Sequence, residues 1–204
     1  MKASAELWVR LKVIDLVVQT AQITLTEKMG FASELCGMAR YSWWALEAEG
    51  PGAAAVSAAI DREIRIDSAF TNQNKHRYRL AVRAGGEEVV TGDLILEADL
   101  PGAGCAGPVF ACDLLVSEQG DARAAGYAAR LGPRLAGLRI ESLRCGEVWR
   151  ILVRAQAREA ALGLVDEMAL TRSRRHGLLV NPHYQRCEVI GVAAVGGEEG
   201  GGRT

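Results

Sequence analysis

The chain has 204 residues, of which 49% are hydrophobic and 24% are charged, and its formal net charge is −1. This is the composition of an average globular protein, and the length allows one large domain or two small ones. The charges form no polybasic tract, which argues against nucleic acid or an anionic membrane as a partner. No apolar run reaches the roughly 18 residues of a membrane span, and the start does not resemble a signal peptide. We therefore expect a cytoplasmic protein.

The first 84 residues predict a β-α-β-α-β unit, which we place at 1–84. Apolar residues alternate with polar ones in the first segment and then change to helical spacing. A longer extended segment ends at a Gly-Pro-Gly turn, after which a second helix and a closing strand follow. The expected elements are a strand over Leu7–Val13, a helix over Leu16–Lys28, an extended segment over Leu35–Ala48, a helix over Ala53–Ile66 and a closing strand within Ala69–Val82.

Both predicted helices of this unit have one apolar face, and an amphipathic helix usually buries such a face. In the first helix the face consists of Leu16, Val17, Thr20, Ile23 and Leu25, and Met29 closes it. In the second helix the face consists of Val56, Ala59, Ile60 and Ile64.

Residues 85–108 break the pattern and form the expected linker. Gly85 and Gly86 are typical of a turn, and Val89-Val90 and Leu94-Ile95-Leu96 could form a hairpin or extend the sheet. The linker also contains a formal GxGxxG at Gly102, Gly104 and Gly107. A dinucleotide fingerprint needs a helix to begin within that motif, whereas Pro108 and a strand follow here, so a flexible linker is favoured.

The same order of elements recurs in a second predicted unit at 109–193. Its expected elements are a strand over Phe110–Val116, a helix over Ala122–Leu131, an extended segment over Leu138–Ala155, a helix over Arg158–Arg175 and a closing strand over Leu179–Val192. Asn72 and Asn181 are 109 positions apart, and so are Arg77 and Arg186, which favours an internal repeat. The Gly/Glu-rich residues 194–204 are expected to be a disordered tail.

The sequence offers little that could support catalysis. There are three histidines and no Gly-x-Ser-x-Gly motif, and the acidic residues on the predicted helices are more typical of a solvated face than of an acid/base pair. The five cysteines are an odd number without a CxxC pair, so we expect reduced thiols and small core residues rather than metal ligands. We predict no catalytic residue, no cofactor and no metal.

The aromatic residues are more informative about interactions. Trp43 and Trp44 are neighbours on an extended segment, so their side chains point to opposite faces of a sheet. One ring can be core, and the other must meet a second layer or a partner, where Trp and Tyr are enriched. The candidate contact residues are Tyr41, Trp43, Trp44, Trp149 and the turn residues Asn181, Pro182 and Tyr184.

Two segments of the chain resemble the PurS family, the small subunit of phosphoribosylformylglycinamidine synthase. In the first half, Cys36 to Glu47 is similar to the family's second strand, in which an Arg, a Gly and an aromatic residue precede an alternating segment. In the second half, Val165 to Met168, Leu178 to Pro182 and Tyr184 to Val189 resemble its helix, Leu-x-Asn-Pro turn and final strand. The first copy lacks the Pro after Asn72, and the second has a shorter first helix.

The resemblance implies an α+β fold of two similar β-α-β-α-β units, PurS-like, packed through their sheets as a pseudo-dimer. It also implies a non-catalytic assembly subunit in purine biosynthesis, which holds a glutaminase subunit against an ATP-dependent synthetase subunit. Self-association is a further expectation. A different class remains open, namely an ACT-like tandem sensor that binds a small molecule between its sheets. A third reading is an enzyme whose site forms only between subunits.

Overall fold

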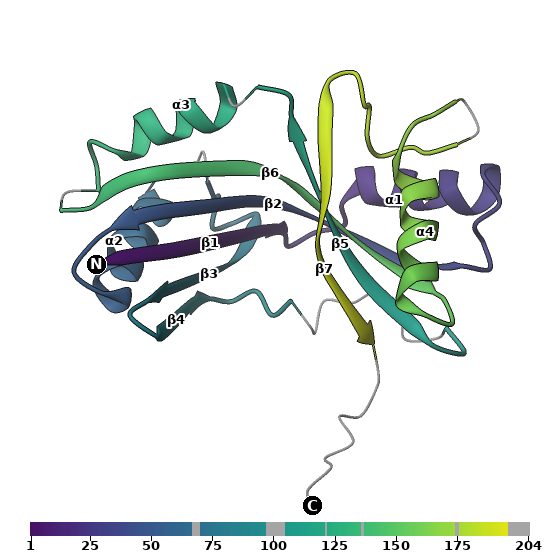
Figure 1. The fold of residues 1–204 in the computed structure, drawn as a ribbon, viewed down its shortest axis with the longest axis horizontal. Helices are drawn as coiled ribbons and strands as arrows, with labels where there is room; N and C mark the ends of the chain where they lie inside the picture. Colours follow the sequence, from purple (N-terminus) through teal and green to yellow (C-terminus); the bar gives the residue numbers. More distant parts are fainter. Residues whose placement is uncertain (67–69, 97–104, 121, 136, 174–175, 196–204) are drawn as a thin grey trace, which may run out of the picture. The chain divides into compact units, whose positions relative to one another are not determined.

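The computed structural model describes residues 1–66, 70–96, 105–120, 122–135, 137–173 and 176–195. Over these residues it is a mixed α+β protein with four α-helices, a π-helical turn and one seven-stranded sheet (Figure 1). The elements in chain order are β1 (Lys2–Leu11), α1 (Leu16–Ile23), η1 (Thr24–Lys28), β2 (Leu35–Glu49), α2 (Ala53–Ile66), β3 (His76–Ala84), β4 (Glu87–Gly92), β5 (Val109–Glu118), α3 (Ala122–Leu131), β6 (Arg139–Arg154), α4 (Arg158–Ala169) and β7 (Gln185–Val195).

The predicted order of strands and helices is confirmed, and α2 and α3 have the predicted bounds. The turn at Gly85 and Gly86 is also confirmed, since both glycines have positive φ, 60° and 84°, and join β3 to β4. Such a two-glycine turn matches the twist of an antiparallel hairpin. Of the two arrangements open for the linker, β4 therefore extends the sheet beside β3, whereas Leu94–Leu96 forms no strand.

The end of the chain differs from the prediction. The helix α4 ends at Ala169 rather than at Arg175, because Leu170 is extended and forms a bridge with Val180. The closing strand β7 begins at Gln185 rather than at Leu179, because the chain first turns at Asn181. The predicted tail begins at residue 194, but β7 continues to Val195, and 196–204 lie outside the described residues.

The turns at Asn72 and Asn181 have the same hydrogen bonds. The Asn72 side-chain oxygen accepts from the Asn74 amide at 3.1 Å, and that of Asn181 accepts from the His183 amide at 3.1 Å. The Asn72 and Asn181 amides donate to side chains four residues later, those of His76 (2.9 Å) and Gln185 (2.8 Å). Both are therefore Asx turns that lead into a strand, so the sequence echo corresponds to a repeated local structure.

The strand order also reflects the repeat. The sheet runs β4-β3-β1-β2-β6-β5-β7. The first half of the chain supplies β3-β1-β2, and the second supplies β6-β5-β7, in which equivalent strands occur in reverse order. In the first half, β1 pairs antiparallel with both β2 and β3.

The contacts divide the chain into two compact units that do not follow the predicted boundaries at 84 and 109. The first unit contains Met1–Asp15, Arg40–Ala98 and Ser117–Val148, and the second contains Leu16–Ala39, Asp99–Val116 and Trp149–Thr204. Each predicted half therefore contributes to both units. The predicted linker contains β4, while its residues 97–104, including Gly102 and Gly104, lie outside the described residues.

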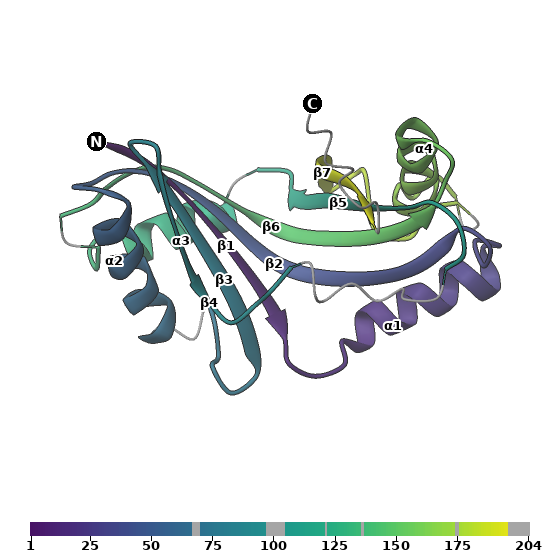
Figure 2. The same cartoon turned by 90° about the horizontal axis from the view of Figure 1, so that it is seen from below.

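In the first unit, α2 and α3 cover one face of the sheet (Figure 2). Alternate residues of β1 point into this core, as expected for a strand with one buried face. The predicted inward residues of α2 also lie in or against it. The core contains Ala3, Ala5, Leu7 and Val9 of β1, Trp44, Leu46 and Ala48 of β2, Leu80, Val82 and Ala84 of β3, Val56, Ile60 and Ile64 of α2, and Leu131 of α3.

The second unit has its own core, to which α1 and α4 both contribute. The helical spacing of Ala161, Leu164, Val165, Met168 and Ala169 predicts an inward face for this helix. In α4 four of these residues are buried, and Leu164 is partly buried against the same core. The strands contribute Cys112, Leu114 and Val116 of β5 and Trp149, Ile151 and Val153 of β6.

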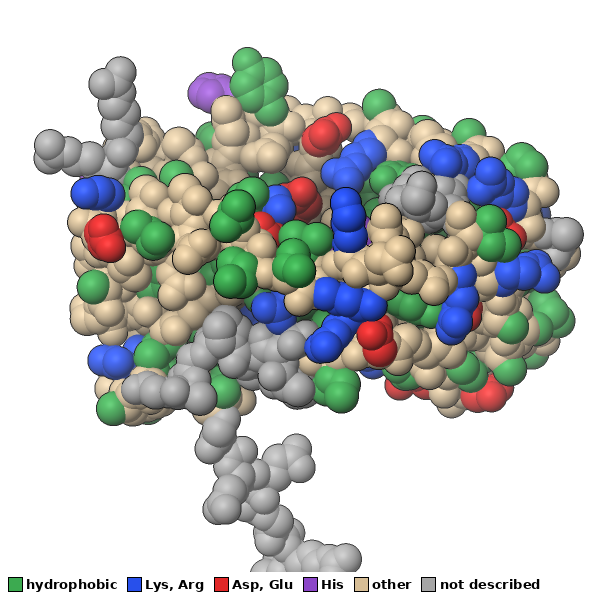
Figure 3. Space-filling view, turned by 180° about the vertical axis from the view of Figure 1, so that it is seen from behind, with side chains coloured by type: hydrophobic (Ala, Val, Ile, Leu, Met, Phe, Trp, Pro, Cys, Tyr) green, Lys and Arg blue, Asp and Glu red, His purple; other side chains and the backbone are tan. Residues whose placement is uncertain are grey.

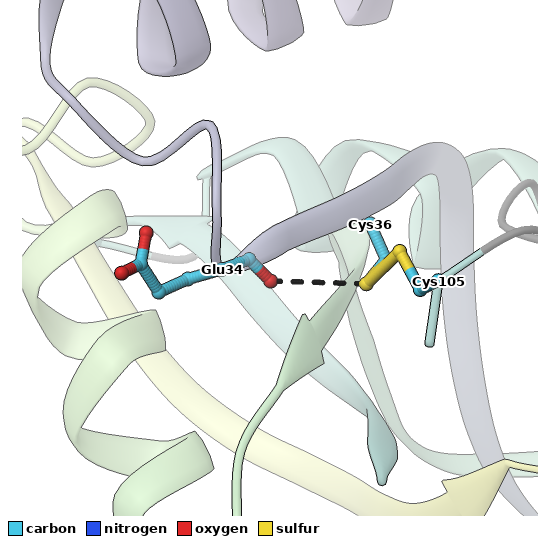
Figure 4. The surroundings of a disulfide bond; sticks show 3 residues. All are labelled: Glu34, Cys36 and Cys105. Carbon is cyan, nitrogen blue, oxygen red and sulfur yellow. Dashed lines mark hydrogen bonds between the residues drawn. A yellow bond between two sulfur atoms is a disulfide. The ribbon is translucent and has the colours of Figure 1, made fainter. Parts of the chain in front are cut away.

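This unit also contains a disulfide between Cys36, near the start of β2, and Cys105 (Figure 4). The expectation that all five cysteines are reduced is therefore wrong for this pair. The carbonyl oxygen of Glu34 lies 3.8 Å from the Cys36 sulfur. This is a van der Waals contact, because a disulfide sulfur carries no hydrogen to donate.

Candidate functional site

The aromatic residues predicted as contacts lie inside the units. Tyr41 is 0% exposed, and Trp43, Trp44 and Trp149 are each 5% exposed. Trp149 belongs to the core of the second unit, and the other three belong to strand β2. In this conformation the four rings offer almost no surface to a partner, so an interface must be built from other side chains.

Trp43 and Trp44 point to opposite faces of β2, as predicted, and each is fixed by contacts in the first unit. The Trp44 ring contacts Phe70 and Tyr127 at centroid distances of 5.5 and 5.6 Å. The Trp43 indole N–H donates to the Glu6 carboxylate at 2.7 Å, and the Arg144 guanidinium lies 5.7 Å from the centre of the Trp43 ring. These interactions hold strands and helices together, which explains the two tryptophans without a partner.

The predicted turn at Asn181, Pro182 and Tyr184 is at the surface of the second unit. All three residues are exposed, and Tyr184 is exposed to 72%. The alternation of Tyr184, Arg186 and Glu188 with Gln185, Cys187 and Val189 predicts a half-buried strand, but residues 186–189 are all exposed. This turn is the part of the predicted interface that a partner can reach.

Helix α1 exposes an apolar surface that the sequence predicted to be buried. Leu16, Val17 and Ile23 are 69%, 49% and 46% exposed, whereas Val18, Ala21 and Leu25 are buried. The apolar face read from the helical spacing is thus largely the outer one, and Leu25 alone of its members is buried. The helix is apolar on both sides because its sequence, LVVQTAQI, contains no charged residue. We call Leu16, Val17 and Ile23 the α1 face.

A groove of about 570 Å³ lies between α3 and the beginning of β6 in the first unit. Small residues of α3 form one wall, and side chains of β6 form the other. The lining residues are Ala124, Ala125, Ala128, Gly132, Leu138, Arg139, Ile140, Glu141, Ser142 and Leu143. We call it the α3–β6 groove.

The beginning of β6 extends past the end of its neighbour β5. The Ala155 amide donates to the Pro108 carbonyl, and Arg150 pairs with Asp113, so the two strands share one antiparallel register. In this register Glu118, the last residue of β5, lies opposite Cys145. Residues 139–143 of β6 therefore lie beyond the end of β5 beside the groove, and a strand that extends past its neighbour can pair with an added strand.

The segment that forms this groove is basic. Between Ala122 and Arg144 the sequence contains five arginines and one glutamate, a net charge of +4 in a chain whose total is −1. The arginines are Arg123, Arg130, Arg134, Arg139 and Arg144. Lys and Arg side chains also gather in groups on the face of the molecule shown in Figure 3. Of these arginines Arg139 alone lines the groove, and there it pairs with Glu49 and Glu141, whereas Arg144 lies against the Trp43 ring. It is therefore the net charge of the whole segment, rather than of the groove lining, that favours an acidic partner.

Two of the three free thiols, those of Cys112 and Cys187, are poor nucleophiles. Burial raises the pKa of the Cys112 thiol to about 11, with a smaller contribution from Asp113, so the reactive thiolate is scarce at neutral pH. Burial and Asp166 also raise the pKa of Cys187. Within the described residues, no group of three or more His, Cys, Asp or Glu side chains is placed to hold a metal ion. No helix in this part of the chain is both long and apolar enough to cross a membrane.

Comparisons of the chain with family models, with curated proteins and with solved structures give no match. The functional inference therefore rests on the residues themselves. Sequence reasoning missed both the α1 face and the α3–β6 groove. The signals were present as a helix without charged residues and a segment with five arginines and one glutamate, but neither signal says which side chains the fold exposes.

Proposed function

We propose that this protein is a non-catalytic assembly subunit that holds two partner proteins together. The α1 face carries this proposal. Three large apolar side chains lie exposed on an uncharged helix. If a partner covered them, binding would gain about 25 cal/mol of free energy for each Å² of apolar surface removed from water. Contiguous apolar surface of this kind typically marks a protein–protein contact.

A bridging subunit needs a second surface with different chemistry, and the α3–β6 groove supplies one. The residues of β6 that extend past β5 beside the groove favour an extended segment, which would add a strand to β6. The net positive charge of residues 122–144 favours an acidic one. The α1 face is apolar and uncharged, so it suits a flat apolar surface instead. Two partners of different kinds fit these two surfaces better than two copies of one partner.

The particular complex we propose is phosphoribosylformylglycinamidine synthase, with the ATP-dependent synthetase and the glutaminase as the two partners. The support is the resemblance of the two segments to the PurS family, together with the repeated Asx turns and the reversed strand order of the two halves. A tandem of two PurS-like units, packed through their sheets, would replace a dimer of single-copy subunits. This role would place the chain in the cytoplasm, where the glutathione pool favours reduction of the Cys36–Cys105 disulfide.

The test is affinity purification of the full chain from extract of its source cells, with mass spectrometry of the proteins that co-purify. We expect a synthetase and a glutaminase. Leu16→Gln/Ile23→Gln should release one of them, and Arg130→Glu/Arg134→Glu should release the other. The matched controls are Val90→Gln, which changes an exposed apolar residue of β4, and Arg62→Glu/Arg83→Glu, which changes exposed arginines elsewhere in the first unit.

Two outcomes would contradict the proposal. One is a wild-type chain that retains neither enzyme with or without ATP and glutamine. The other is release of both partners by the control variants to the same extent as by the surface variants. Thermal melting of each variant shows whether a loss of binding reflects unfolding instead.

A further inference from the structure

A polar pocket of about 300 Å³ lies in the first unit, where β1 and β4 end and β3 begins. Its lining comes from separate segments of the chain that converge at one place, as small-molecule sites do. The lining residues are Lys12, Arg65, Gln73, His76, Tyr78, Gly92 and Asp93.

The two cations of the pocket are held in place by other groups. The Lys12 ammonium donates to the Gln73 carbonyl oxygen at 2.6 Å. The Arg65 guanidinium donates to the Asp61 carboxylate at 2.8 Å, and the same carboxylate accepts the Tyr78 hydroxyl at 2.5 Å. Side chains fixed in this way lose little further conformational entropy when a ligand binds.

His76 adds a directed hydrogen-bond donor. Its Nδ1 accepts the Asn72 amide hydrogen at 2.9 Å, so the neutral ring carries its proton on Nε2. Because burial, and then Lys75 and Lys12, lower the pKa of His76, the ring is neutral at pH 7. The Nε2–H group is therefore an uncharged hydrogen-bond donor, and the positive charges that line the pocket are those of Lys12 and Arg65.

The wall formed by the end of β4 is rigid. Gly92 has φ of 101°, and a Cβ at this position would collide with the Tyr78 carbonyl oxygen. The next residue, Asp93, accepts the Tyr78 amide hydrogen at 3.3 Å and lies 4.0 Å from Arg77. The carboxylate of Asp93 is thus engaged by the backbone and by a cation of its own.

The charges around the pocket favour an anion. Lys12, Arg65, Lys75 and Arg77 carry four positive charges, whereas Asp61 and Asp93 carry two negative ones. We propose that this pocket binds the oxyanion group of a small metabolite, a phosphate ester or a carboxylate, with Lys12 and Arg65 as charge partners and His76 Nε2–H as donor. A volume of about 300 Å³ is at the small end of ligand sites.

The experiment uses the full chain alone, so its result is independent of the assembly function. The histidine ring signals are followed by NMR while inorganic phosphate, glycerol 3-phosphate or succinate is added at constant ionic strength against chloride. His76→Gln assigns the signal. We expect a saturable shift of the His76 ring and a rise of its pKa when the anion is bound. The groups that face His76 are Lys12, Arg65, Lys75, Tyr78 and Asp93.

Lys12→Gln should weaken binding roughly tenfold, the scale of one charge-assisted hydrogen bond. The matched control is Lys28→Gln, which removes an exposed lysine of the second unit. Preference for glycerol 3-phosphate assigns the ligand to phosphate esters, and preference for succinate assigns it to carboxylates. The absence of a saturable shift, or equal weakening by both lysine variants, would overturn the proposal. Thermal melting confirms that the variants are folded.

Discussion

Arg150 of β6 and Asp113 of β5 form a two-point ion pair inside the second unit. Arg150 Nε lies 2.7 Å from Asp113 Oδ1, and a second guanidinium nitrogen donates to Oδ2 at 2.8 Å. The side chains are only 10% and 14% exposed. Gly191 of β7 leaves room for the carboxylate, because a Cβ there would stand 3.2 Å from Oδ2. The pair thus links β5 and β6, and β7 passes close to its carboxylate.

Breaking this pair should destabilise the protein strongly. Arg150→Met leaves the Asp113 carboxylate buried without its cation, and such a loss typically costs about 3–5 kcal/mol. The double variant Asp113→Leu/Arg150→Met removes both charges and should recover most of this loss. Urea denaturation of the four proteins in the cycle measures the difference. If the double variant were as unstable as the sum of the single variants, the pair would not be the source of the effect.

The disulfide predicts a definite thiol count and a loss of stability on reduction. Unfolded oxidised protein should react at three thiols, Cys112, Cys145 and Cys187, and reduced protein at five. Cys36 and Cys105 are 69 positions apart, and closing a loop of that length stabilises by roughly 4 kcal/mol in the chain-entropy description. Cys36→Ser should therefore lower Tm, whereas Cys187→Ser, which changes an exposed thiol, should not. Five reactive thiols before reduction would show that the bond does not form.

The Tyr78–Asp61 hydrogen bond should make stability fall at alkaline pH. Burial, followed by the bond to Asp61 and its charge, raises the pKa of Tyr78 to about 12. Because an unfolded tyrosine has a pKa of about 10, the bond contributes fully below pH 10 and its contribution is lost as pH rises toward 12. Tyr78→Phe should cost about 1.5–3 kcal/mol at pH 7, the range for a hydrogen bond to a charged group. The difference between wild type and variant, measured by denaturation, should shrink through this window, and a constant difference would contradict the assignment.

The buried and the exposed side of the continuous helical segment formed by α1 and η1 should respond differently to truncation, and Leu25 lies in η1. Leu25 is 0% exposed, so Leu25→Ala removes buried methyl groups and should cost about 2–5 kcal/mol. Ile23 is 46% exposed, so Ile23→Ala should change stability by about 0.5 kcal/mol or less. Thermal or urea denaturation of the isolated chain compares the two. Equal costs would mean that the α1 face is covered within the protein, and the proposed docking role would lose its basis.

Local features of the fold could be predicted because short-range chemistry determines them. The turn chemistry of Gly50 and Gly52 placed the start of α2, and Gly132-Pro133 placed the end of α3. Gly85-Gly86 predicted the turn into β4, and the echo of Asn72 at Asn181 predicted two similar turns. In each case the few neighbouring residues that predict the turn are also the residues that form it.

Burial of individual side chains was harder to predict where a segment has two apolar sides. In α1 the spacing of Leu16, Val17 and Ile23 fits a core face as well as that of Val18, Ala21 and Leu25 does. Only the packing against the other elements of the second unit decides between them. Likewise, the sequence makes Trp43 a candidate contact residue, but its indole N–H donates to Glu6 and its ring lies against Arg144. Both partners are distant from Trp43 in the sequence, so no local pattern indicates them.

The sequence by itself determined the order of the strands and helices and the turns between many of them, because periodicity and turn residues act over a few positions. The tertiary structure alone decided the strand order, the partition of both halves between two units, the Cys36–Cys105 bond and the pocket around His76. These features join residues far apart in the chain. Their formation depends on which distant surfaces bury each other most favourably, and no local pattern contains that information.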